Sequence, residues 1–547
     1  MRNMRQGVVD RLNLQQEGVS RAGLVCGLIL GGILLLSLFL RLWGGEFGLP
    51  TYTLYHPDEH ALVDRAAAIL WTGDWNLHRF NYPPFYAYVQ AVAYAGYFLL
   101  GASRGLWSEV PAFTLTQYYH VGRTVTALMG TATILAVYLV GRQIFRRRAG
   151  LLAAALLGGA YLHIIHSHYA TFDVMVSLLA SLTLLFSTLI ETRGQARWYL
   201  LAGLCAGLAG ATKYNGAVVF ILPLIAHVLS TPWEEWGWLD GRLFLAGGGF
   251  VVGFFGANPF ALGDLPAFLN GLAQVLHHYG TEQPGFEGRG NWRWYVGVFA
   301  TSVDAPWLAA GAAGLVGLLW REWKKGLLLL AFPLLYYLMI SRFVVRFERN
   351  ALPLLPFLAL GGGWLIDSVA DRLTSLLQRP GRDRPTNRTW SHGIAVMICI
   401  ALLALPLAAA VGLNLALSRV DYRESAGLWV EENIAEGTKI AIEHYAIPFD
   451  YDRYHVEDIV RVGDHDLDWY MQEGFEIVIV SDGVWPILLN QPEIYHDRVK
   501  AYEAVTGGST LLAEFVPHPL GLVVAGYPTV AVYHFAPVRI YRLPQGG

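Results

Sequence analysis

Long apolar runs recur along most of this 547-residue chain and constrain its fold more than any other feature. About eleven of them are long enough to cross a hydrocarbon layer roughly 30 Å thick. They begin near residues 22, 119, 149, 173, 198, 214, 241, 295, 326, 351 and 393. With 54% hydrophobic and only 15% charged residues, the composition is also that of a membrane protein. We therefore expect a mostly α-helical, polytopic membrane protein.

The first run, from about Gly23 to Leu42, follows an arginine-rich stretch. It is too long for a signal-peptide core and lacks a convincing cleavage site, so we interpret it as a retained transmembrane helix. The three cysteines all fall inside apolar runs and show no spacing typical of zinc or redox chemistry. A net charge of -3 does not favour nucleic acid as a partner.

The basic residues between the runs predict the orientation of the chain. If the N-terminus is cytoplasmic, the arginine and lysine clusters fall on the cytoplasmic side, as the positive-inside rule requires. These clusters are Arg142 with Arg146 to Arg148; Arg193 and Arg197; Arg242; Arg321, Lys324 and Lys325; and Arg372 to Arg388. The assignment treats residues 85–100, which follow Tyr82-Pro83-Pro84, as an interfacial helix rather than a span. It places the long first loop, residues 44–118, and a later loop around residues 262–294 on the outer face. The later loop could form a lid or bind the acceptor, since it carries His277, His278, Glu282, Glu287, Arg289, Trp292 and Trp294.

The chain changes character near residue 420, where hydropathy falls and helical and strand patterns alternate. We expect helices near 423–433 and 492–504, and strands near 439–443, 475–481, 522–525 and 530–541. The sequence therefore predicts two domains. Residues 1–419 form the transmembrane domain, and residues 420–547 form a soluble extracytoplasmic α/β domain.

The segment Tyr55-His56-Pro57-Asp58-Glu59-His60 opens a helical pattern in the first outer loop. Proline in a first helical turn, followed by two acids that complement the helix dipole, is an ordinary helix start. Charged residues beside membrane spans are costly, however, and are candidates for function. The local sequence leaves both interpretations open.

The order of several motifs on the predicted outer face resembles the GT-C glycosyltransferases, in particular the protein O-mannosyltransferases and the aminoarabinose transferases that modify lipid A. After the acidic helix start and the Pro-Pro segment, the resembling motifs are Val121-Gly122-Arg123-Thr124, Gly141 to Phe145, His168-Tyr169-Ala170 with Asp173, Thr212 to Gly216, Arg349 to Pro356, and Trp429 to Glu443. The resemblance covers most of the membrane part. It implies a GT-C fold and transfer of a sugar from a polyprenyl-phosphate donor with inversion of the anomeric centre.

Sugar transfer needs a base that takes the acceptor proton near an oxocarbenium-like centre, and a carboxylate can fill that role. We assign Asp58 as the base. Glu59 points to another helix face and is expected to orient Asp58 or the acceptor. Asp173 is the second acid, which in the resembling enzymes lies near donor or acceptor; alternatively it is only an acid of a first helical turn.

A leaving lipid phosphate calls for fixed cations. The candidates for phosphate binding are Arg123, Lys213, Arg346 and Arg349; alternatively, such cations only reach towards lipid headgroups. The resembling families carry Lys or His just before the Pro-Pro segment, where this chain has Tyr82 preceded by Asn81. At this position Asn81 and Tyr82 are candidates for substrate binding. The other candidates for substrate binding are His56 and His168.

No cofactor is expected to be required, although the histidines and acids of the outer face could hold a divalent metal. The expected protein is a multi-pass transferase of the inner or plasma membrane, surrounded by membrane lipids. Its expected partners are a polyprenyl-phosphate-linked sugar and a protein, lipid or glycan acceptor. The competing hypotheses are a transporter or flippase for a lipid-linked sugar, which should show repeat symmetry, and a non-catalytic membrane scaffold.

Overall fold

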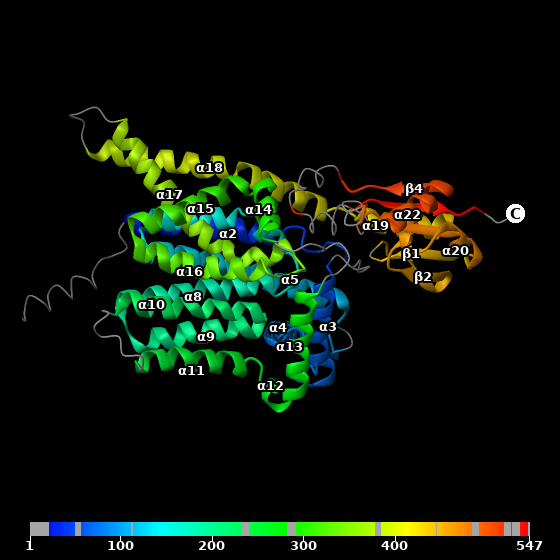
Figure 1. The fold of residues 1–547 in the computed structure, drawn as a ribbon, viewed down its shortest axis with the longest axis horizontal. Helices are drawn as coiled ribbons and strands as arrows, with labels where there is room; N and C mark the ends of the chain where they lie inside the picture. The colour runs from blue at the N-terminus through cyan, green and yellow to red at the C-terminus, as the bar shows by residue number, and fades with distance from the viewer. Residues whose placement is uncertain are drawn as a thin grey trace, which may run out of the picture.

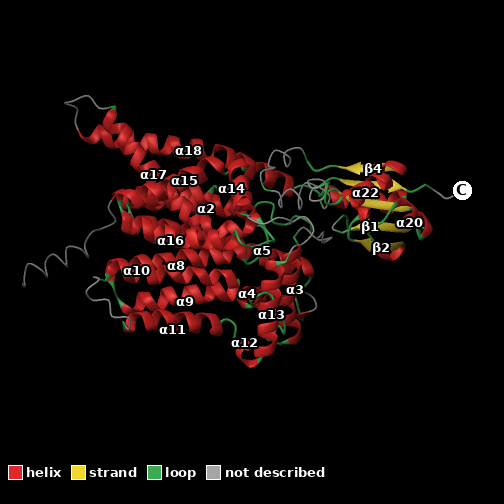
Figure 2. Ribbon diagram, viewed as in Figure 1, coloured by secondary structure: helices red, strands yellow, loops and turns green. Residues whose placement is uncertain are grey.

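The computed structural model describes residues 21–49, 56–110, 113–231, 240–281, 291–377, 384–444, 446–483, 492–518, 527 and 536–544. Figure 1 shows a large helical body and, beyond one end of it, a small unit that contains the strands. Figure 2 separates the two parts by secondary structure, with the strands confined to the small unit. This confirms a mostly helical chain with a C-terminal α/β part. The boundary between residues 419 and 420 stays a prediction.

Long helices run roughly side by side through the body (Figure 1). They are α2 (Arg21–Leu42), α5 (Leu115–Ile144), α6 (Arg147–Gly158), α8 (Asp173–Arg193), α9 (Ala196–Thr212), α10 (Ile221–Ser230), α11 (Gly241–Gly256), α15 (Ala305–Arg321), α16 (Trp323–Ile340), α17 (Leu355–Leu376) and α18 (Arg384–Leu417). Shorter helical pieces connect them: α7 (Tyr161–His166), η2 (Tyr214–Phe220), α12 (Phe260–Gly263), α14 (Trp292–Thr301) and η4 (Glu348–Leu354).

Within the described ranges, 6 helical segments are both long and apolar enough to cross a membrane, and Tyr214–Ser230 and Gly241–Gly256 are shorter apolar ones. A multi-pass membrane protein is supported, but the expected count of about eleven spans is not established. The run expected from residue 295 is divided into α14 and α15. The division falls before Pro306, which lies in the first turn of α15, where a proline without an N–H is tolerated.

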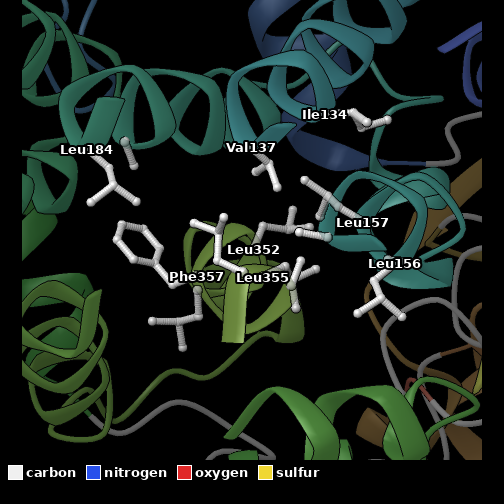
Figure 3. Close-up of a cluster of buried hydrophobic side chains, with 14 of the residues drawn as sticks. Ile134, Val137, Leu156, Leu157, Leu184, Leu352, Leu355 and Phe357 are labelled. Carbon is white, nitrogen blue, oxygen red and sulfur yellow. The ribbon is translucent and has the colours of Figure 1, made fainter. Parts of the chain in front are cut away.

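The centre of the helical body is an apolar core around the start of α17. Figure 3 shows side chains from five elements meeting there: Leu352 of η4, Leu355 and Phe357 of α17, Ile134 and Val137 of α5, Leu156 and Leu157 of α6, and Leu184 of α8. All of these side chains are buried. Because η4 enters directly into this packed core, the residues at its start are held in place.

Small residues bring α9 and α11 into close contact. A Cβ added at Gly203 or Gly207 would clash with the backbone of α11, and one added at Gly249 or Gly253 would clash with the backbone of α9. Such close backbone approach is typical of helices that pack in a membrane, where lipid offers no hydrophobic driving force for association.

Three helices lie at the end of the body nearest the strands: α3 (Pro57–Thr72), α4 (Phe85–Ala102) and α13 (Leu265–Gly280). In Figure 1, α3 and α13 run steeply across the direction of the long helices. The side chain of Trp71 in α3 donates a hydrogen bond of 2.7 Å to the Tyr118 hydroxyl at the start of α5. The interfacial position expected for α4 stays a prediction.

Over its described residues, the C-terminal unit contains a 5-stranded sheet in the order β2-β1-β3-β5-β4. Its described elements are α19 (Tyr422–Asn433), β1 (Lys439–Glu443), η5 (Tyr451–Arg453), β2 (His455–Ile459), η6 (Val462–Asp464), α20 (Leu467–Gln472), β3 (Ile477–Ser481), α22 (His496–Gly508), β4 (Thr510–Phe515) and β5 (Val538–Arg542). β1 pairs in parallel with β2 and β3, whereas β5 pairs antiparallel with β3 and β4. The strand expected near 522–525 lies outside the described residues.

Tyr527 attaches the C-terminal part to the helical body. Its buried hydroxyl donates a hydrogen bond of 2.7 Å to Asp304, and its ring stacks on Tyr161 at 5.9 Å. The same carboxylate accepts hydrogen bonds from the backbone N–H groups of Tyr161 and Leu162 and from the indole of Trp307. A buried carboxylate with four donors is well satisfied, so this contact fixes the start of α7.

Candidate active site

The start of α3 has the geometry of an ordinary helix N-terminus, as one of the two sequence interpretations holds. His56 is the N-cap, and its Nδ1 accepts a hydrogen bond of 3.2 Å from the Asp58 backbone N–H. Asp58 and Glu59 occupy the first turn, where the helix dipole favours negative charge. Their side chains, however, are engaged by residues far away in the sequence, and the two acids have different partners.

Asp58 forms an ion pair with Arg349, the second residue of η4. The Arg349 Nη2 and Asp58 Oδ2 atoms are 2.9 Å apart, and both side chains are largely buried, at 8% and 13% exposure. The Tyr82 hydroxyl donates a second hydrogen bond of 2.9 Å to Asp58 Oδ1. Burial by itself raises the pKa of Asp58, but Arg349, His56 and Tyr82 outweigh it and lower the pKa to about 2. Asp58 is therefore an ionised carboxylate at neutral pH.

Lys213, at the end of α9, forms a second acid–cation pair close by. Its Nζ donates hydrogen bonds of 2.7 Å to Asp173 Oδ1 at the start of α8 and of 2.9 Å to Asn350 Oδ1. All three residues are buried. Since Asn350 directly follows Arg349, the segment η4 connects the two pairs. Asn350 was not among the sequence candidates, although its position next to Arg349 could have suggested it.

Asp58, Arg349 and Lys213 line one cavity of about 680 Å³. Asn81 and Tyr82 also line it, so it brings together five of the residues proposed from sequence. Much of the remaining wall is apolar and comes from α13, from the end of α16 and from the segments that follow α7 and α16: Leu272, Val275, Leu276, Met339, Phe343, Phe347 and Phe172. A charged end beside an apolar wall suits an amphiphilic ligand with an anionic head.

Several residues of this cavity were missed by the sequence analysis. The loop expected over residues 262–294 contains the helix α13, which contributes Gln274 and Tyr279 to the wall as well as His278, a residue already noted from sequence. The Tyr279 ring stacks on Phe343 at 4.5 Å. The residues Glu282, Glu287 and Arg289, which the same loop was expected to offer to an acceptor, lie outside the described residues.

Glu59 and Arg123 form a pair of their own away from this cavity. The Arg123 Nε and Nη2 atoms donate to the two Glu59 carboxylate oxygens at 2.8 and 3.0 Å, and both side chains are buried. Arg123 Nη1 donates to the backbone carbonyls of Gly45 and Phe47, and Glu59 also accepts the Ala170 backbone N–H. The structure therefore does not bring Arg123 to the cavity with Lys213 and Arg349. The Glu59–Arg123 pair instead connects α3 to α5 and to the first loop.

The other candidates occupy separate places. Arg346 donates a hydrogen bond of 2.7 Å to Asn291 and lies over the Trp294 ring, and it does not line the cavity. His168 is buried, with its ring nitrogens 3.0 Å from the Ile164 carbonyl oxygen and 3.1 Å from that of Trp43. His56, the N-cap of α3, is buried, and burial lowers the pKa of its imidazole to about 3. None of these three residues lines the cavity.

Over the part of the chain that the structure describes, no group of three or more His, Cys, Asp or Glu side chains could hold a metal ion. The expectation that no cofactor is required stays a prediction.

Tyr82 provides a test of the contacts around Asp58. In a Tyr82→Phe variant the hydroxyl that stabilises the carboxylate is lost, so the pKa of Asp58 should rise from about 2 towards its ordinary value of 3.8. From the sequence, Asp58 is expected to be the base of sugar transfer. On that expectation the acid limb of kcat/KM moves to higher pH, and transfer at pH 7 falls about tenfold because the carboxylate is less well oriented. An unchanged pH–rate profile would show that Tyr82 does not act on Asp58. The matched control is Tyr97→Phe, at an exposed tyrosine of α4.

Comparison with known proteins identifies the class of fold. Residues 117–259 match the family model described as dolichyl-phosphate-mannose-protein mannosyltransferase. Solved GT-C glycosyltransferase structures match almost the whole chain. The chain therefore has the GT-C fold, and its similarity to this superfamily is confirmed.

Two structures represent these matches. ArnT from Cupriavidus metallidurans bound to undecaprenyl phosphate has a TM-score of 0.52 and 16% identity, with 96% of this chain and 100% of that chain covered. The archaeal oligosaccharyltransferase AglB from Archaeoglobus fulgidus, in complex with an inhibitory peptide and a dolichol-phosphate, has a TM-score of 0.51 and 12% identity, with 93% and 77% covered. No curated protein sequence matches this chain. These matches show the fold that this chain shares with the two structures.

Proposed function

We propose that this protein transfers a sugar from a polyprenyl-phosphate donor to an acceptor hydroxyl on the outer face of the membrane. Asp58 acts as the base, and Lys213 and Arg349 bind the phosphate of the lipid carrier. The reaction is a direct displacement that inverts the anomeric centre and needs no metal. The observation that carries the proposal is the single cavity in which an ionised carboxylate, two cations and an apolar wall meet.

Each part of this cavity corresponds to one need of the reaction. A carboxylate accepts the acceptor proton as the new C–O bond forms. Buried cations stabilise the charge that develops on the leaving phosphate, and a guanidinium does so with directed hydrogen bonds. Apolar side chains of α13 suit the first isoprene units of the lipid. ArnT bound to undecaprenyl phosphate and AglB in complex with a dolichol-phosphate support a donor of this kind.

The proposed orientation follows from the direction of α5. Its first turns lie against α3, and its 30 residues span about 45 Å. Arg142 in its last turn, with Arg146 to Arg148 after it, therefore lies far from Asp58, at the end that the positive-inside rule assigns to the cytoplasm. Figure 1 places the C-terminal strands beyond the opposite end, near α3. We propose a cytoplasmic N-terminus and an outer C-terminal unit in the inner or plasma membrane.

The full-length protein in liposomes provides the test. Polyprenyl-phosphate-linked sugars extracted from membranes are supplied together with protein, lipid and glycan acceptors, and mass spectrometry follows the release of free polyprenyl phosphate and the mass gain of each acceptor. We expect both products without added metal and in the presence of a chelator. A protein that only moves the lipid-linked sugar across the membrane would leave its glycosidic bond intact, and this result would refute the proposal.

A further inference from the structure

The two acid–cation pairs at the cavity differ in what they expose. Asp58 and Arg349 both line the cavity, so an incoming ligand can reach the two members of this pair. In the other pair, Lys213 lines the cavity, whereas Asp173 is buried at 2% exposure and does not. An anion that binds Lys213 leaves Asp173 covered. An anion that binds Arg349 approaches the carboxylate of Asp58 directly.

This arrangement creates a conflict of charge. The Arg349 guanidinium that should hold the lipid phosphate is already 2.9 Å from Asp58. Two anions that share one cation at this distance repel each other in a buried site, where electrostatic forces are strong. The resting site is therefore arranged for Asp58, and a lipid phosphate must compete with Asp58 for the same cation.

The reaction itself removes this conflict. The acceptor hydroxyl forms a bond to the anomeric carbon, the bond from that carbon to the phosphate oxygen breaks, and the hydroxyl proton moves to Asp58. The donor is a phosphodiester with one negative charge, and the leaving polyprenyl phosphate is a monoester that carries up to two. Asp58 thus becomes neutral in the same step in which the phosphate gains a charge.

We propose that Arg349 is exchanged during the reaction, pairing with Asp58 before transfer and with the leaving phosphate as Asp58 takes up the proton. The inference rests on the proposed function and concerns how the ion pairs of the same site change during the reaction. The Arg349 guanidinium lies 3.9 Å from the centroid of the Phe347 ring, which also lines the cavity. It can therefore turn from one anion to the other across this ring and keep its cation–π contact.

The exchange predicts an unusual effect on binding. At neutral pH the ionised Asp58 opposes the binding of polyprenyl phosphate, so an Asp58→Asn variant should bind this lipid more tightly than the wild type does, although it cannot serve as a base. We expect the dissociation constant for undecaprenyl phosphate to fall at least about tenfold. Binding is measured with the purified full-length protein in nanodiscs, by the change in tryptophan fluorescence.

A double-mutant cycle tests whether Arg349 carries the effect. Arg349→Gln should weaken binding of undecaprenyl phosphate about tenfold or more, and in the Asp58→Asn/Arg349→Gln double variant the gain from Asp58→Asn should disappear. Arg349→Lys, which keeps the charge, controls for misfolding. Asp64→Asn, at an exposed position of α3, controls for loss of negative charge on the same helix and should not alter binding.

Each other outcome contradicts the exchange. Equal affinity of wild type and Asp58→Asn, a gain that persists without Arg349, or an equal gain in Asp64→Asn would each overturn it. If the wild-type protein transfers sugar but one of these results is found, the exchange is refuted and the proposed function is retained. If the wild-type protein neither binds undecaprenyl phosphate nor transfers sugar, both the exchange and the proposed function are refuted.

Discussion

Asp58→Asn is expected to lower the rate of sugar transfer by about 10²–10⁴-fold, the usual contribution of a positioned general base. The asparagine side chain can still accept from Tyr82 and has nearly the same volume, so the start of α3 should remain folded. The asparagine lacks the carboxylate that takes up the acceptor proton. Single-turnover measurements with the lipid-linked donor in excess of its dissociation constant would report this step separately from binding.

The matched control for this prediction is Asp64→Asn, which removes the same charge from an exposed position on α3. It should transfer sugar at the wild-type rate. If Asp58→Asn retained wild-type transfer while its thermal unfolding was also unchanged, Asp58 could not be the base, and the mechanism proposed for this cavity would be wrong.

Arg123→Met is expected to destabilise the protein by about 3–5 kcal/mol, because it leaves the Glu59 carboxylate buried without its cation. Arg123 also holds the carbonyl groups of Gly45 and Phe47, so the first loop should loosen in the same variant. The measurement is the thermal unfolding midpoint of the protein in detergent. The KM for the donor should stay unchanged in the molecules that remain folded.

This prediction distinguishes a structural role of Arg123 from the phosphate binding that was expected from sequence. A residue that binds the donor phosphate would raise the donor KM and leave the unfolding midpoint nearly unchanged, which is the opposite result. Arg104→Met, at an exposed arginine after α4, is the control for loss of one positive charge and should affect neither quantity.

The sequence predicted much of the architecture because hydropathy and helix-start preferences are local properties. Apolar runs indicated helices that the structure contains, for example α8, expected from residue 173 and observed at Asp173–Arg193. The change of pattern near residue 420 likewise predicted β1 and β3. The division of one expected run into α14 and α15 was missed, because its apolar residues continue across the break.

The candidate site was only partly predictable. The acidic helix start and the cations were recognisable as residue types, and the resemblance to GT-C enzymes indicated that they belong together. Neither the composition nor the motif order could show that Asn350 contacts Lys213, or that α13 supplies an apolar wall. Such contacts join segments far apart in the chain, and their register depends on how whole helices pack.

By itself, the sequence determined that the chain forms a helical membrane protein with a C-terminal α/β part and two acids at the start of α3. Only the tertiary structure decided how these neighbouring acids divide their tasks. Successive residues of a helix point about 100° apart, so Asp58 and Glu59 face different surroundings. Asp58 meets Arg349 at the open cavity, and Glu59 meets Arg123 in the packed interior. The packing of η4 and α5 around α3 places one carboxylate where a substrate can reach it and buries the other.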